Sequence, residues 1–159
     1  MSTTFDPAAS TGQAPAPGRA TAGIDPRGPQ FAASLTAVVL VAVLLLPPTA
    51  ALVLTAVQAA LFALGATRGV QRTPHAWLFK TLVRPRLSAP TELEDPAPPR
   101  FAQAVGLGFT VVALVAYAAG GIVVAQTAIG FALVAALLNA VFRFCLGCEM
   151  YLLFRRAAA

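Results

Sequence analysis

Two cysteines near the C-terminus are the residues best suited to chemistry. Cys145 and Cys148 are the only cysteines among 159 residues, and they lie three positions apart. On a helix this spacing places both side chains on one face, close enough for a disulfide or for two thiolate ligands to one metal ion. Arg143 lies two residues earlier, and a nearby cation stabilises a thiolate. The sequence therefore predicts a redox pair of Cys145 and Cys148, with Arg143 as thiolate stabiliser.

Three interpretations of the pair stay open. Thiol redox or sulfur handling is opposed by the expected position at the C-terminal end of a helix, where the helix dipole disfavours a thiolate, unless Gly147 breaks that helix. A metal site completed by His75 and Glu149 is weak, because a closed zinc site needs four ligands and the chain has one histidine. No metal is therefore expected. The third interpretation is that the cysteines are small apolar residues without a chemical role.

The composition indicates a membrane protein. Hydrophobic residues make up 58% of the chain and charged residues 11%, and the mean hydropathy is +0.76. A soluble domain has about 25% charged residues. The net charge of +5 could indicate nucleic-acid binding, but the basic residues lie in short segments between long apolar runs and form no basic face. The expected partner is the lipid bilayer, with no nucleic acid.

Four apolar segments predict an all-α membrane protein with four transmembrane helices. They cover residues 31–46, 49–66, 101–119 and 124–146, the last with a further turn or two toward residue 154. At about 1.5 Å per residue, such segments reach roughly 25 Å or more, near the lower limit for crossing a bilayer. Pro47 and Pro48 separate the first two segments, and Gly120 and Gly121 separate the last two. The helices are therefore expected to form two tandem hairpins.

The charges predict the orientation. Every lysine and arginine lies in the N-terminal arm, between the second and third segments, or near the C-terminus, and the two short turns are uncharged. The positive-inside rule then places both termini in the cytoplasm of a multi-pass protein of the cell membrane. Between the second and third segments, Thr73 and Pro74 are typical of a helix start, and Trp77, Phe79 and Leu82 follow at apolar positions. They predict a short amphipathic helix in the cytoplasmic interface.

A short repeat divides the chain into two halves. Residues 25–32 read DPRGPQFA and residues 95–102 read DPAPPRFA, with five matches at a constant offset of 70. The sequence therefore predicts a disordered arm over residues 1–23 and a transmembrane domain over 24–159, with hairpin repeats at 24–87 and 94–156. At this offset Cys145 falls opposite His75.

Several motifs carry a resemblance to a known family. They are GIDPRGP (23–29), LVRPRL (82–87), ELEDP (92–96), PRFAQ (99–103) and FCLGCEMY (144–151). The chain resembles a bacterial, mainly actinobacterial, integral-membrane family catalogued as domain of unknown function 4395, over nearly everything after residue 22. Family members are associated with thioredoxin-like and sulfurtransferase proteins, so the resemblance implies thiol or sulfur chemistry. Arg143 stands where the family leads us to expect a small residue. A looser, fold-level likeness to four-helix membrane oxidoreductase subunits suggests quinone as an oxidant.

Two functions follow as hypotheses. The first is a thiol–disulfide redox or sulfur-relay protein, in which a cytoplasm-facing Cys145 and Cys148 exchange with a thioredoxin-like or sulfurtransferase partner. No cofactor is evident, although quinone fits this hypothesis. The alternative is a non-catalytic accessory subunit of a larger membrane complex, held together by small residues such as Ala132, Ala136 and Ala140. Whether the protein is an enzyme is left open.

Overall fold

The structure of the chain, a computed structural model, describes residues 23–90 and 92–158. The predicted disordered arm therefore lies outside the described residues, except for Gly23. Within the described ranges the protein is helical and contains no strand apart from one isolated bridge. Its α-helices are α1 Arg27–Leu45, α2 Pro48–Arg68, α3 Pro74–Leu78, α4 Ala97–Ala118, α5 Ile122–Phe142 and α6 Leu146–Ala157.

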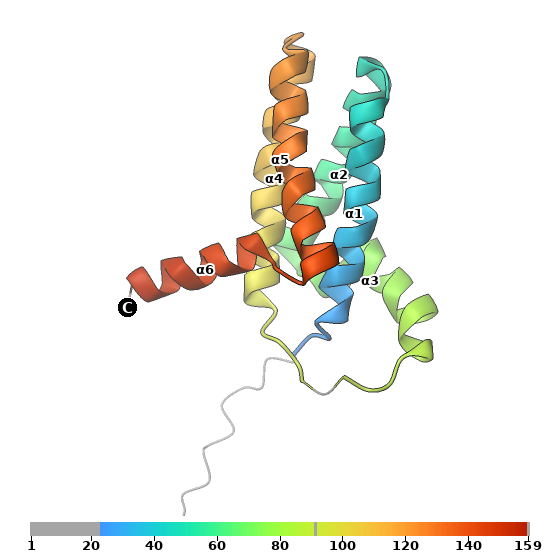
Figure 1. Cartoon of the computed structure of the whole chain (residues 1–159), viewed down its shortest axis with the longest axis vertical. Helices are drawn as coiled ribbons and strands as arrows, with labels where there is room; N and C mark the ends of the chain where they lie inside the picture. The colour runs from blue at the N-terminus through green and yellow to red at the C-terminus, as the bar shows by residue number, and fades with distance from the viewer. Residues whose placement is uncertain (1–22, 91, 159) are drawn as a thin grey trace, which may run out of the picture.

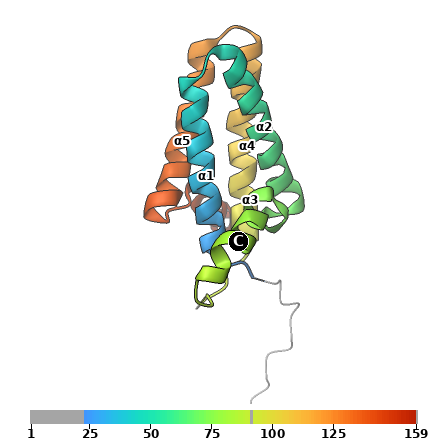
Figure 2. The ribbon, with the colours of Figure 1, turned by 90° about the vertical axis from the view of Figure 1, so that its right-hand side faces the viewer.

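The four long helices α1, α2, α4 and α5 form one bundle (Figure 1). In it, α1 lies beside α2 and α5, and α4 lies beside the same two helices (Figure 2). All four are long and apolar enough to cross a membrane. Many large apolar side chains on their outer faces are exposed, as expected for surfaces that face lipid. The prediction of an all-α protein with four potential membrane helices is confirmed.

The bundle core is built largely from small side chains. Ala51, Ala113 and Ala125 are at most 1% exposed, and Leu40 and Ile129 are completely buried beside them. Small residues allow helix backbones to approach closely, which is the main source of packing energy where lipid removes the hydrophobic drive for association. Part of the alanines of the sequence therefore lie where the helices pack, whereas others, such as Ala56 and Ala60, are exposed.

Both α1 and α4 begin earlier than the apolar runs. An aspartate two residues before each helix accepts a hydrogen bond from the first backbone N–H of that helix: Asp25 from the N–H of Arg27 at 3.0 Å, and Asp95 from that of Ala97 at 2.9 Å. Prolines follow in the first turn of each helix, where a missing N–H costs nothing. The helices can therefore extend about one turn beyond the apolar segments.

The starts of α1 and α4 also contact one another. The backbone groups of Ile24 and Glu94, which are 70 positions apart, exchange two hydrogen bonds of 2.9 Å. An antiparallel bridge between residues at the repeat offset is the arrangement expected around a local twofold axis. The two helix starts are thus joined beneath the bundle.

The ends of α2 and α5 are bound in corresponding ways. The amide of Gln30 in α1 donates to the carbonyl oxygen of Ala140 near the end of α5, at 3.0 Å. The guanidinium of Arg100, 70 positions after Gln30, donates to the carbonyl oxygens of Ala66 and Thr67 near the end of α2. Helix ends leave carbonyls without intrahelical partners, so each half of the chain closes a helix of the other half.

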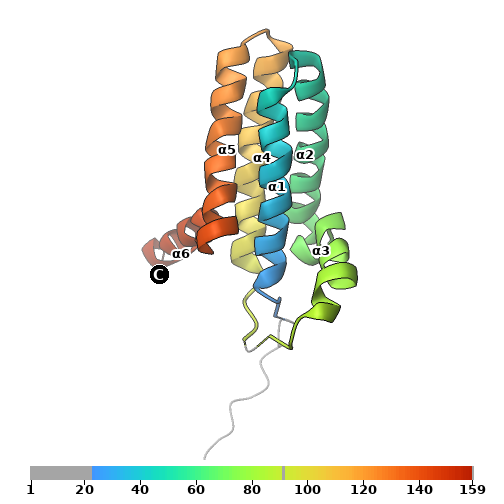
Figure 3. The ribbon, with the colours of Figure 1, turned by 45° about the vertical axis from the view of Figure 1, so that its right-hand side comes forward.

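The segments after α2 and α5 leave the bundle on opposite sides, α3 on one side and α6 on the other (Figures 1 and 3). The predicted helix start at Thr73 is confirmed: α3 continues as a π-helix over Phe79–Val83 and a 3₁₀ turn over Arg84–Arg86. The predicted fourth apolar segment was wrong at its C-terminal end. Instead of continuing to residue 146 or beyond, α5 ends at Phe142, and a separate helix, α6, follows.

Candidate thiol–disulfide site

The candidate site follows the C-terminal end of α5, where the chain turns sharply at Arg143. Arg143 adopts a left-handed backbone conformation with φ of 56°, and it is the only non-glycine residue in the described ranges with positive φ. The backbone N–H groups of Arg143 and Phe144 donate to the carbonyl oxygens of Asn139 and Leu138, at 3.1 and 3.2 Å. These bonds close the helix in the way that a left-handed cap does, usually with glycine in this position. The chain is thereby turned out of the bundle axis.

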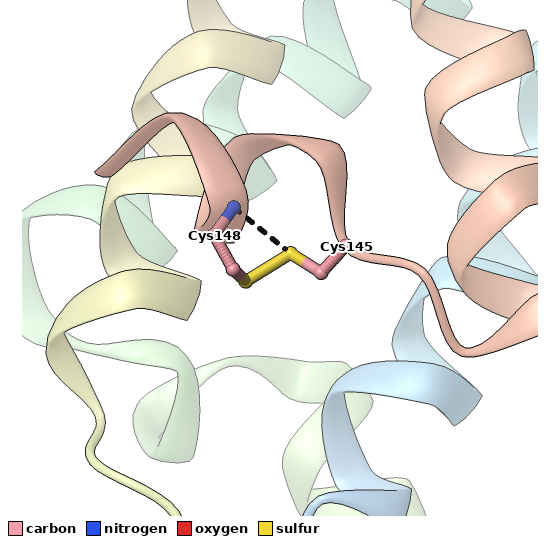
Figure 4. The surroundings of a disulfide bond; sticks show 2 residues. All are labelled: Cys145 and Cys148. Atoms are coloured by element: carbon pink, nitrogen blue, oxygen red, sulfur yellow. Dashed lines mark hydrogen bonds between the residues drawn. A yellow bond between two sulfur atoms is a disulfide. The ribbon is translucent and has the colours of Figure 1, made fainter. Parts of the chain in front are cut away.

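Cys145 is the N-cap of α6. Its backbone is extended, and its Sγ accepts a hydrogen bond from the backbone N–H of Cys148 at 3.3 Å. The two side chains form a disulfide, with their Cα atoms 5.2 Å apart (Figure 4). The expectation that the pair lies at the C-terminal end of the fourth helix was therefore wrong. The break at residues 143–145 puts both cysteines at the positive, N-terminal end of a new helix.

Close contact with α4 fixes the start of α6. A Cβ added to Gly147 would lie 2.7 Å from the Cα and Cβ atoms of Ala102, so only glycine fits without movement of the backbone. Farther along α6, the rings of Tyr151 and Phe154 pack on Phe101, with centroids 5.8 and 6.1 Å away. The helix that carries the disulfide is therefore held against the N-terminal part of α4 by a backbone contact and by aromatic packing.

A cavity of about 230 Å³ lies next to the disulfide. Its wall includes Cys145 and Gly147, and most of the remaining lining is apolar, from α1, α2, α4 and α5. Two amide side chains, Gln103 and Asn139, are the main polar groups in the wall. Cys148 does not contribute to the wall, so the two cysteines differ in surroundings: Cys145 borders the interior of the bundle.

The charged residues near the pair are exposed. Arg143 and Glu149 both have exposed side chains, one before and one inside the first turn of α6. An acidic residue in the first turn interacts favourably with the helix dipole, whereas an added cation beside the sulfur atoms favours a thiolate. The assignment of Arg143 as thiolate stabiliser remains a prediction.

His75 is not brought to the cysteines. It lies in α3, on the side of the bundle opposite α6 (Figure 3). Together with Lys80 and Arg84 it lines a second cavity of about 370 Å³. Burial lowers the pKa of His75, so the neutral imidazole is favoured. Within residues 23–90 and 92–158, no three His, Cys, Asp or Glu side chains are close enough to share a metal ion. The set of Cys145, Cys148, His75 and Glu149 is thus not assembled.

The counterpart of Cys145 in the first half is Thr73, and the sequence reasoning missed it. Thr73 is the N-cap of α3, and its Oγ1 accepts from the N–H of Ala76 at 3.3 Å, as Cys145 does from Cys148. The left-handed or positive-φ residues that end the preceding helices, Gly69 and Arg143, also correspond. Thr73 and Cys145 are 72 positions apart, whereas the offset of 70 from the helix starts sets Cys145 opposite His75.

The comparisons with known proteins give the family but no activity. The profile of one family, described as Domain of unknown function (DUF4395), matches residues 24–156. No curated protein and no solved structure matches the chain significantly. Because the match covers more than four-fifths of the chain, including both the bundle and the cysteine pair, this membrane protein belongs to the family Domain of unknown function (DUF4395).

Proposed function

We propose that this protein is a membrane-embedded thiol–disulfide redox or sulfur-relay protein that uses Cys145 and Cys148. The observation that carries the proposal is the position of Cys145 as N-cap of α6, with its Sγ bonded to the N–H of Cys148. Partial positive charge at a helix N-terminus stabilises a thiolate, which is the nucleophile in disulfide exchange. The pair also lies within disulfide distance.

The reaction is a two-step exchange with a soluble protein partner. A thiolate of a reduced thioredoxin-like partner attacks one sulfur of the Cys145–Cys148 disulfide, forms a mixed disulfide and releases the other cysteine as a thiolate. The second thiol of the partner then resolves the mixed disulfide. The partner leaves as a disulfide, and Cys145 and Cys148 become the dithiol. With a sulfurtransferase that carries a persulfide, a thiolate of the reduced pair would attack the outer sulfur of that persulfide, become a persulfide itself and release the thiolate of the partner.

The proposal includes an orientation. The positive-inside rule puts α3, α6 and both chain ends in the cytoplasm of a cell-membrane protein, where soluble partners can reach the pair. The basic residues Arg155 and Arg156 at the end of α6 support this orientation. With the corresponding contacts of Ile24 and Glu94, and of Gln30 and Arg100, we also interpret residues 24–87 and 94–156 as two copies of one hairpin unit.

Thiol alkylation tests this proposal directly. Intact cells and inverted membrane vesicles are treated with a membrane-impermeant maleimide, with and without prior reduction. We expect Cys145 and Cys148 to be labelled in inverted vesicles. Molecules in which the two cysteines form a disulfide should be labelled only after reduction. Labelling in intact cells contradicts the orientation. Two results together contradict the function and favour an accessory subunit. The pair is never oxidised under any growth condition, and Cys145→Ser and Cys148→Ser leave the thiol and sulfur phenotypes of the cell unchanged.

The role of Arg143 is tested by two substitutions that separate charge from backbone. Arg143→Gly removes the guanidinium and favours the left-handed conformation, whereas Arg143→Ala removes the guanidinium and keeps the backbone strain. If the charge stabilises the thiolate, both variants react more slowly with an alkylating agent at pH 7, by a similar factor. Wild-type reactivity in Arg143→Gly would remove Arg143 from the site.

A further inference from the structure

The cavity beside Cys145 opens toward the lipid-facing side of the bundle. Phe131 and Val134 belong to its wall, yet their side chains are 59% and 56% exposed on the outer surface of α5. Phe109 of α4 also lines it and packs on Phe131, with ring centroids 6.2 Å apart. The wall of the cavity therefore includes both Cys145 and side chains that are exposed on the outer, apolar surface of the bundle.

The lining of the cavity restricts the chemistry of its ligand. Apart from the amides of Gln103 and Asn139 and the hydroxyl of Thr36, the side chains in the wall are apolar or cysteine, and no charged side chain contributes. A charged ligand would thus be desolvated without an ion-pair partner, which is costly. A neutral molecule with hydrogen-bond acceptors would instead be bound by apolar contact and by the donor groups of the two amides.

The volume of the cavity sets the size of the part that can enter. About 230 Å³ is below the roughly 300–1,000 Å³ typical of a complete small-molecule site. It suits a single substituted ring with the rest of the molecule left in the bilayer. A lipid-soluble ring with two carbonyl oxygens and an isoprenoid-type tail has this shape.

We propose that the cavity binds the ring of a membrane quinone, which accepts the electrons of the Cys145–Cys148 dithiol. This inference rests on the proposed function, because it names the second substrate of the same pair. Cys145, which borders the cavity, is the cysteine closest to the ring, and Gln103 and Asn139 donate hydrogen bonds to the ring carbonyls. Cys148, outside the cavity wall, exchanges with the soluble partner.

The step balances in electrons and protons. The two thiols lose two protons and two electrons and become one disulfide, and the quinone gains both and becomes the quinol. The exchange with the partner then regenerates the dithiol, so that each cycle oxidises one partner dithiol and reduces one quinone. Quinol leaves through the opening at Phe131 into the bilayer, where membrane oxidation can regenerate the quinone.

The test uses the full chain in lipid nanodiscs. The protein is reduced, freed of reductant and mixed with decylubiquinone, and both quinol formation and thiol loss are followed. We expect one quinol for each disulfide formed. Ala135→Phe, which fills the cavity, and Asn139→Leu, which removes an amide, should each slow quinol formation roughly tenfold or more, a loss of about 1.4 kcal/mol of transition-state stabilisation. Leu137→Phe is the matched control, since Leu137 is exposed and does not line the cavity.

Exchange of the disulfide with dithiothreitol separates this inference from the function on which it rests. Ala135→Phe and Asn139→Leu should leave that exchange at the wild-type rate, which also shows that the variants are folded. If they slow quinol formation no more than Leu137→Phe, or if wild-type protein forms no quinol while exchanging normally, the quinone site is wrong and the thiol function stands. Failure of both reactions in the wild type overturns both proposals.

Discussion

After α2 the chain leaves the bundle through Gly69 and Thr73 into α3, and after α5 it leaves through Arg143 and Cys145 into α6. Both exits have a positive-φ residue, an extended N-cap, and a side chain that accepts from the N–H three positions on. In the first exit the acceptor is a hydroxyl, a typical N-cap group. In the second it is a sulfur, a weak acceptor. The two exits therefore share their backbone geometry. The second exit has the weaker N-cap, but its cap residue is part of a disulfide.

The cavities beside the two exits differ in the polarity of their walls. The cavity next to α3 includes His75, Lys80 and Arg84, and is lined by polar as well as apolar groups. The cavity next to α6 has no charged side chain in its wall and reaches Cys145. One framework therefore produces a basic, partly polar site in the first half and an apolar site with a disulfide in the second. The substitutions below test whether the N-cap position controls this difference.

Replacing the sulfur cap by the hydroxyl cap should have the largest effect. In Cys145→Thr, exchange with dithiothreitol and with a thioredoxin-like protein should fall to the background rate, because no disulfide can form. The helix α6 should remain, since threonine is a better N-cap than cysteine. Thiol titration and hydrogen exchange of residues 146–157 measure the two effects separately. Loss of α6 protection would show that the disulfide, and not the cap, orders this helix.

The reverse substitution should transfer the pair to the first exit. In a Cys145→Ser, Cys148→Ser background, Thr73→Cys with Ala76→Cys places two cysteines where Oγ1 of Thr73 and N of Ala76 are 3.3 Å apart. We expect an intramolecular disulfide, detected by a mass loss of two hydrogen atoms and by resistance to alkylation. Thr73→Cys with Trp77→Cys is the control, because residue 77 is one position farther along α3. Equal disulfide yield in the control would contradict the equivalence of the exits.

Contact with α4 should make Gly147 sensitive to a single methyl group. In Gly147→Ala the new Cβ meets Ala102 backbone at 2.7 Å, so α6 must shift, at a cost of about 1–3 kcal/mol. Gly130→Ala is the control, because nothing lies within 4 Å of its added Cβ and alanine favours a helix by about 1 kcal/mol. Thermal unfolding in detergent measures both. A stable Gly147→Ala protein would contradict close packing of α6 on α4.

Removal of the hydroxyl cap should have the smallest effect. In Thr73→Ala the N–H of Ala76 and the carbonyl oxygen of Val70 lose their side-chain partner, and α3 loses about 1 kcal/mol of local stability. Thr73→Ser keeps the hydroxyl and should retain most of it. Hydrogen exchange of the amides at 76–78 measures the change, which should not affect thiol exchange at Cys145. A matching loss of thiol exchange would indicate that the two exits are coupled.

Several features of the site could be predicted from local patterns. The spacing of Cys145 and Cys148 predicted a disulfide-distance pair, and Thr73 followed by Pro74 predicted the helix start that the structure contains. Gln58 interrupts an apolar segment of the sequence, and it is only 1% exposed, although its amide has no hydrogen-bond partner within the described residues. A polar residue in an apolar run predicts burial against protein, but its hydrogen bonding depends on what the neighbouring helices present.

By itself the sequence determined the membrane helices, since their length and lack of charge leave few alternatives to spanning a bilayer. It also determined that the two cysteines lie close together, because side chains three residues apart are close in nearly any helical geometry. Only the tertiary structure decided where α5 ends. Apolar residues lie on both sides of Arg143, so the sequence favours a continuous helix, and the break depends on a left-handed Arg143 and on the contact of Gly147 with Ala102 in α4. Because of packing against a helix distant in sequence, the cysteines lie at the start of α6 and not, as the sequence alone suggests, at the end of α5.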